Sequence, residues 1–206
     1  MISIPKKAQI FIALIVFFIS NAQLSADINK PFQIVQILSN DDDIIDVKSG
    51  DTIEVYATYN VSDGQKVTGI GIQIHYNSNC LDLLNIDNVY PDGEQGHKQK
   101  NDSENEDNDP LTDRAIVLAW SSLGGNTWPY QELPIELIRM TLKVKYVGLL
   151  VSTQINVVEI SKPGNYAFQG ENLQLFINTK EKLDINDDGI FNMIDIIQTL
   201  NHVKDN

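Results

Sequence analysis

The chain has 206 residues and a formal net charge of −13 at pH 7. This length suffices for one sandwich or barrel domain with a small appendage, and 42% hydrophobic residues suffice for a buried core. An excess of carboxylates repels phosphate backbones, so the composition argues against a nucleic-acid partner. Acidic chains also attract divalent cations, although the ordinary consequence of such a charge is solubility.

The first 26 residues have the pattern of a secretory signal peptide. Lys6 and Lys7 form a positive region, and Ile10–Ile19 is an unbroken apolar run. The run is shorter than the roughly 20 apolar residues that a membrane-spanning helix needs. We therefore expect a secreted protein, cleaved after Ala22 or Ala26, with no membrane association once the signal is removed.

Cys80 is the single cysteine, so the chain cannot form an internal disulfide. Secreted eukaryotic domains of this size often carry paired cysteines, and their absence favours a bacterial exported protein. We expect Cys80 to be a small buried residue rather than a reactive thiol.

Residues 27–178 consist largely of short runs in which apolar and polar residues alternate. Alternation with a period of two buries one face of a strand and leaves the other in water, as in antiparallel sheets. Turn residues separate the runs, for example at Ser49–Asp51 and Lys162–Gly164. The pattern predicts an all-β, two-sheet sandwich with about nine strands, at 32–38, 44–47, 52–58, 67–76, 81–84, 115–121, 137–147, 151–158 and 173–177.

A polar insertion at residues 91–114 interrupts the strand pattern and is rich in Asp, Glu and Asn. Within it, Asp107, Asp109 and Asp113 are the best candidates for a metal site in the sandwich. Their spacing matches no defined calcium loop, so a solvated, mobile loop is the simpler interpretation.

A second interruption, at residues 123–134, is rich in Gly and Pro and holds Trp128 and Tyr130. Exposed aromatic rings in such a loop could stack on a sugar, which makes these two residues candidates for ligand binding. Packing over a sheet edge is the simpler interpretation, and Trp120, in an apolar run, is expected in the core.

The residues Asp184–Asp195 read DINDDGIFNMID and match a twelve-residue calcium-binding loop. Hard cations such as Ca²⁺ take about six to eight oxygen ligands, which such a loop supplies from alternating positions. Gly189 at the sixth position permits the sharp turn that the loop requires. The predicted ligands are Asp184, Asn186, Asp188, the backbone carbonyl of Ile190, Asn192 and Asp195.

The loop leads into a predicted terminal helix, which Asn192 can cap. The alternative is an Asx-rich turn that caps this helix without a metal. A single unit of one calcium loop and one helix cannot bury its own apolar face. The helix must therefore dock on the sandwich, pair with another chain or stay partly ordered. The apolar stripe consists of Met193, Ile194, Ile197, Leu200 and Val203.

The pattern D-x-N-x-D-G-x-x-N-x-x-D before an Ile/Leu helix resembles one repeat of the type I dockerins, which close the loop with Asp. Dockerins carry two such repeats and bind cohesins in cellulosome-type assemblies. Residues 179–206 match a single repeat. The positions that usually contact a cohesin are Met193 and Ile194 here, apolar rather than hydroxyl-bearing. The resemblance therefore implies calcium binding, while capture of a cohesin does not follow from it.

The region 32–178 resembles a cohesin domain, in the carbohydrate-binding-module-like superfamily. This resemblance implies a nine-stranded jelly roll that binds a dockerin or a carbohydrate rather than catalysing a reaction. The residues that carry it are Ser49–Thr52 before a strand, Val67–Tyr76 with Gly69 and Gly71, Asn77, the following Leu81, and the later runs 138–147 and 153–158.

No catalytic motif stands out, and the three histidines lack metal-ligand spacing, so we expect that the protein is not an enzyme. We expect a secreted, Ca²⁺-binding, cohesin-like module for extracellular protein assembly or polysaccharide-associated adhesion. Its partner would be a dockerin- or cohesin-like protein module or a polysaccharide. The alternatives are a carbohydrate-binding module with a calcium-stabilised tail and, less favoured, a glycosidase that uses paired carboxylates.

Overall fold

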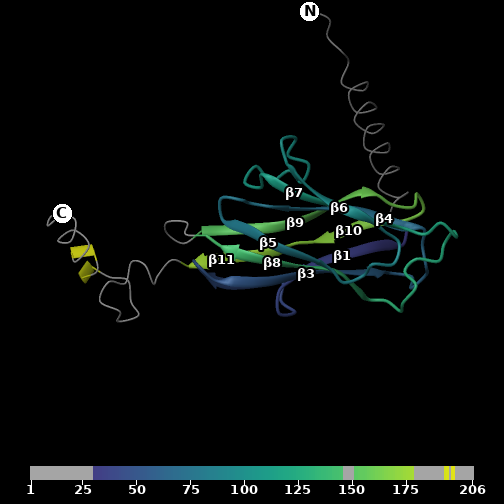
Figure 1. The fold of residues 1–206 in the computed structure, drawn as a ribbon, viewed down its shortest axis with the longest axis horizontal. Helices are drawn as coiled ribbons and strands as arrows, with labels where there is room; N and C mark the ends of the chain where they lie inside the picture. Colours follow the sequence, from purple (N-terminus) through teal and green to yellow (C-terminus); the bar gives the residue numbers. More distant parts are fainter. Residues whose placement is uncertain (1–29, 146–150, 179–192, 195, 198–206) are drawn as a thin grey trace, which may run out of the picture.

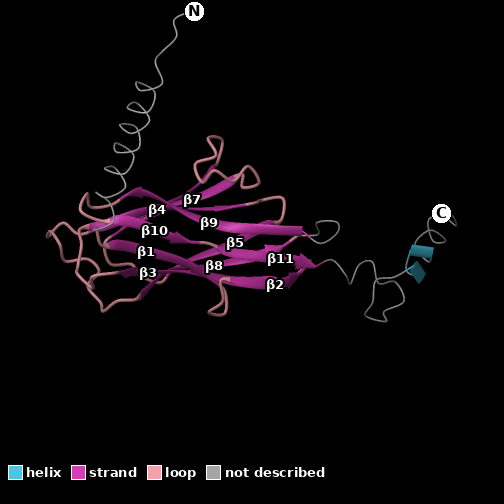
Figure 2. Cartoon of the chain, turned by 180° about the vertical axis from the view of Figure 1, so that it is seen from behind, coloured by secondary structure: helices cyan, strands magenta, loops and turns pink. Residues whose placement is uncertain are grey.

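Two β-sheets stack face to face in the computed structural model, which describes residues 30–145, 151–178, 193–194 and 196–197 (Figure 1). One sheet has the strand order β10-β1-β3-β8-β5 and the other β2-β11-β9-β4-β7-β6. Strands make up the body of the domain, and the loops that connect them lie at its ends and also project above and below the strands in this view (Figure 2). The strands are β1 (Phe32–Leu38), β2 (Ile44–Lys48), β3 (Thr52–Val61), β4 (Gly69–Tyr76), β5 (Leu81–Asn88), β6 (Glu94–Asn101), β7 (Arg114–Ser121), β8 (Ile135–Val144), β9 (Val151–Ser161), β10 (Ala167–Glu171) and β11 (Leu173–Asn178).

The predicted all-β sandwich is confirmed, and its core follows from the alternation seen in the sequence. In β1 and β3 alternate residues are buried, among them Val35, Ile37 and Val55. Burial of such side chains stabilises a fold by about 1.5–3 kcal/mol each. Cys80 is also buried, as expected, and burial raises the pKa of its thiol.

Strand β4 departs from simple alternation because all eight of its residues are buried. Ile72 and Ile74 lie opposite Leu118 and Ile116 of β7, and all four belong to the core. Since neighbouring side chains of a strand point to opposite faces, His75 lies on the outer face of the sheet. A strand buried on both faces requires a cover over that outer face.

Two strands lie in segments for which the sequence predicted none. Strand β6 falls within the polar insertion 91–114 and pairs antiparallel with β7, so interpreting the insertion as a mobile loop was wrong for residues 94–101, whereas residues 102–113 do form a loop. The pairing rests on backbone hydrogen bonds, and polar or lysine side chains are what an edge strand needs to avoid further pairing. Strand β10 pairs in parallel with β1 at the edge of the other sheet.

The predicted signal peptide, residues 1–26, lies outside the described residues. So do the ligand positions of the calcium loop from Asp184 to Asn192, and Asp195. Residues 193 and 194, near the end of this loop, and residues 196 and 197, directly after it, are helical. None of the described helical segments is long and apolar enough to cross a membrane.

Candidate functional site

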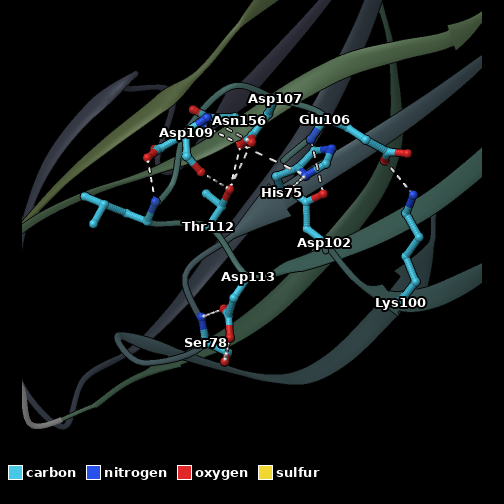
Figure 3. A network of polar contacts seen from close by, with 11 residues as sticks. His75, Ser78, Lys100, Asp102, Glu106, Asp107, Asp109, Thr112, Asp113 and Asn156 are labelled. Atoms are coloured by element: carbon cyan, nitrogen blue, oxygen red, sulfur yellow. Dashed lines mark hydrogen bonds and ion pairs between the residues drawn. The ribbon is translucent and has the colours of Figure 1, made fainter. Parts of the chain in front are cut away.

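A cluster of polar side chains lies where the β6–β7 loop, residues 102–113, covers the outer face of β4 and β9 (Figure 3). His75 of β4 and Asn156 of β9 are partners in the antiparallel pairing of these strands. Both are buried, at 0% and 5% exposure. The loop therefore supplies the cover that the outer face of β4 requires.

His75 and Asp102 form a fully buried contact in this cluster. Nδ1 of His75 lies 2.8 Å from Oδ2 of Asp102, and both side chains are fully buried. The other carboxylate oxygen of Asp102 accepts a hydrogen bond from the backbone N–H of Glu106 at 3.2 Å. Nε2 of His75 has no hydrogen-bond partner in the described part of the chain. Asp102 thus holds the imidazole and the loop in one arrangement.

Asp107 joins the loop to β9. Its side chain is fully buried, and its Oδ2 lies 4.0 Å from Nδ1 of His75. The same oxygen accepts hydrogen bonds at 2.8 Å from the hydroxyl of Thr112 and from Nδ2 of Asn156. Oδ2 of Asp109 lies 3.4 Å from that Nδ2. His75, Asp102 and Asp107 each offer a ligand atom within 4.8 Å of the others, so this group could hold a metal ion.

Of the three carboxylates predicted as a second metal site, the structure brings Asp107 and Asp109 together on Asn156. Asp113 faces elsewhere: its carboxylate accepts hydrogen bonds at 2.6 Å from the amide and from the hydroxyl of Ser78 (Figure 3). Sequence reasoning missed His75 as a member of the cluster. The available signal was its position, odd-numbered in a strand whose even-numbered residues are three isoleucines and a tyrosine.

The Asp113–Ser78 contact leads to a pH-dependent prediction. Burial raises the pKa of the Asp113 carboxyl, but the two hydrogen bonds from Ser78, together with the charge of Arg114, outweigh burial and leave the pKa below its usual range. A carboxyl whose pKa is lower in the folded than in the unfolded state stabilises the fold at pH values above its unfolded-state pKa of about 3.9. This contribution is lost as the pH falls through the folded-state pKa. We expect Asp113→Asn to lower the free energy of unfolding by about 0.5–1 kcal/mol at pH 7, because the pair is exposed to solvent.

Urea denaturation of both proteins at pH 7 and at pH 3 measures this difference. It should shrink at the lower pH. A difference of the same size at both pH values would show that the charge of Asp113 does not carry the effect.

Trp128 cannot stack on a sugar, which corrects its assignment as a candidate ligand-binding residue. Its side chain is 0% exposed and its ring centroid lies 4.8 Å from that of Tyr59. Backbone hydrogen bonds to Val67 hold the residue against the sandwich, so the packing interpretation is the correct one. Trp120 is also in the core, as expected, whereas Tyr130 is 53% exposed.

No protein-family model matches the sequence, and no curated protein matches it. Among solved structures, the fold is similar to cohesin modules. A cohesin module from a Clostridium perfringens family 33 glycoside hydrolase aligns with a TM-score of 0.46 at 18% identity, covering 71% of this chain and 97% of that module. CaCohA2 from Clostridium acetobutylicum aligns with a TM-score of 0.44 at 11% identity, covering 71% of this chain and 92% of CaCohA2. The third similar structure is a chain of the Coh-OlpC–Doc435 type I cohesin–dockerin complex from Clostridium thermocellum. It aligns with a TM-score of 0.43 at 11% identity, covering 72% of this chain and 94% of that chain.

Proposed function

We propose that the protein is an exported, calcium-binding, cohesin-like module that binds another protein in extracellular assembly. The calcium-loop pattern of Asp184–Asp195 at the end of a β-sandwich carries this proposal. Carboxylate and amide oxygens at alternating positions of such a loop suit Ca²⁺. Ca²⁺ bound there would order the loop and the helix that follows it.

The helical residues at the end of the loop and directly after it support a protein partner. Met193, Ile194 and Ile197 are 67%, 53% and 51% exposed. Apolar side chains that gather on one face of a helix favour contact with another surface, since water is a poor environment for them. The calcium loop would therefore present this face to a dockerin- or cohesin-like module.

Calorimetric titration of Ca²⁺ into the full mature chain tests the terminal site. We expect Asp184→Ala combined with Asp188→Ala to remove one molar equivalent of bound Ca²⁺ and the calcium-dependent gain of helix in circular dichroism. Asp187→Ala is the matched control, because position 4 is not a ligand position in the twelve-residue loop pattern. An unchanged stoichiometry in the double variant would rule out this site.

Partner binding is tested by titrating the labelled protein with purified type I dockerin and cohesin modules, in Ca²⁺ and in EDTA. Calcium-dependent binding of either module, lost in Asp184→Ala plus Asp188→Ala, is the expected result. A glycan array run beside it tests the carbohydrate alternative. Glycan binding that Tyr130→Ala removes, with no binding of either protein module, would overturn assembly as the function.

A further inference from the structure

We propose that the sandwich holds a second divalent-cation site, for Ca²⁺, formed by Asp107 and Asp109 of the β6–β7 loop and by Asn156 of β9. This site is separate from the terminal loop and does not depend on it. Figure 3 shows the three side chains turned toward one another at the place where the loop meets the sheet.

The first argument is the charge that the cluster buries. The side chains of Asp102 and Asp107 are both fully buried. Among the described residues, the basic group near them is His75, whose Nδ1 lies 2.8 Å from Oδ2 of Asp102 and 4.0 Å from Oδ2 of Asp107. His75 supplies at most one positive charge for two buried carboxylates, and Asp109 adds a third carboxylate nearby. The neighbouring Lys100 ammonium pairs with Glu106 at 2.5 Å, and this pair holds the pKa of Glu106 low. A buried carboxylate without a compensating charge is strongly unfavourable, and a bound cation removes that cost.

The second argument is the Asn156 amide, which is only 5% exposed. Its Nδ2 lies 2.8 Å from Oδ2 of Asp107 and 3.4 Å from Oδ2 of Asp109, while its Oδ1 has no partner within the described ranges. A half-turn of the amide exchanges these two atoms and places an oxygen beside both carboxylates. Oxygens 2.8 and 3.4 Å apart subtend about 70–90° at an ion that binds each at about 2.4 Å, which fits calcium coordination.

The third argument is the chemistry of the donors. The Thr112 hydroxyl lies 2.8 Å from Oδ2 of Asp107 and 2.9 Å from the backbone carbonyl of Asp109, so two further oxygens lie close to the site. A pocket of about 470 Å³, bordered by Asp107, Asp109 and Asn156, gives room for water ligands and for entry of the ion. Nδ1 of His75 already contacts Asp102. An all-oxygen donor set favours calcium over zinc.

Occupation of this site would join the β6–β7 loop to β9 across β4. The loop covers the otherwise solvent-facing side chains of His75 and Asn156, so the ion would fix which surface this sheet presents. Calcium would then order the sandwich surface in addition to the terminal helix.

Calcium titration of the full mature chain carrying Asp184→Ala and Asp188→Ala tests the site without the terminal loop. We expect one molar equivalent of Ca²⁺ to remain bound, and to be lost when Asp107→Asn and Asp109→Asn are added. Asp113→Asn in the same background is the control and should retain the equivalent. No bound Ca²⁺ in the Asp184→Ala, Asp188→Ala protein overturns this proposal and leaves the terminal site standing.

Asn156→Asp in that same background gives a second readout that a purely structural network would not produce. The substitution removes the Nδ2 donor that faces Asp107 and Asp109 and places a third carboxylate beside them. The melting temperature in EDTA should therefore fall. The substitution also adds a charged ligand, so Ca²⁺ should bind about tenfold more tightly and raise the melting temperature more than in the parent. An equal loss of melting temperature with and without Ca²⁺ would show that the network is structural only and would overturn the proposal.

Discussion

Replacement of Trp128 by alanine is expected to lower the free energy of unfolding by about 3–5 kcal/mol. The indole is 0% exposed and packs against the rings of Tyr59 and Trp120, at centroid distances of 4.8 and 6.4 Å. Its Nε1 also donates a hydrogen bond to the backbone carbonyl of Asp92 at 3.1 Å. Alanine removes these contacts, leaves a cavity and deprives that carbonyl of its donor. Urea denaturation followed by circular dichroism measures the loss.

Tyr130→Ala is the matched control for this experiment, two residues along the same loop. Its ring is 53% exposed, so we expect a change within about 0.5 kcal/mol. A stability for Trp128→Ala equal to that of the wild type would contradict the core position and would make sugar stacking by Trp128 tenable again. Because the Trp128 variant is expected to be unstable, loss of ligand binding in it would not identify a binding residue.

The sequence was sufficient to predict those strands that pack one face on the core. Runs such as 32–38 and 52–58 alternate because the inner residues of β1 and β3 exclude water and the outer ones do not. Strand β6 carries no such alternation, since it lies at the edge of its sheet and is held by backbone hydrogen bonds to β7. Backbone pairing leaves no mark on residue type, which is why this strand was missed.

The candidate site was predictable only in its local part. Asp107 and Asp109 are neighbours in the sequence and stand out in an acidic insertion. His75 and Asn156 meet them through contacts that span 27 residues from His75 to Asp102 and 49 residues from Asp107 to Asn156. Such contacts depend on how the β6–β7 loop folds back over the sheet, and no local pattern specifies that path. Asp113 was grouped with the other carboxylates because spacing along the chain does not show that Ser78 binds it.

Substitution of Gly69 by alanine is expected to be the most damaging single methyl addition in the described sandwich, at about 4 kcal/mol or more. Gly69 has φ of +141°, which side chains rarely adopt, and pairs with Ser121 of β7. A Cβ there would lie 2.1 Å from the carbonyl oxygen of Trp120 and 2.8 Å from Cα of Ser121. Both are backbone atoms of the neighbouring strand, so relief requires that β4 and β7 separate and lose ladder hydrogen bonds.

Gly164→Ala provides the control, because a Cβ at that position meets no atom within 4 Å and its φ is outside the left-handed region. We expect the control to change the free energy of unfolding by less than about 0.5 kcal/mol. Chemical denaturation, with the yield of folded protein as a second measure, compares the two variants. A Gly69→Ala protein as stable as the control would mean that β4 and β7 are not paired as described. A backbone approach this close, at a positive φ, explains why only glycine fits at position 69.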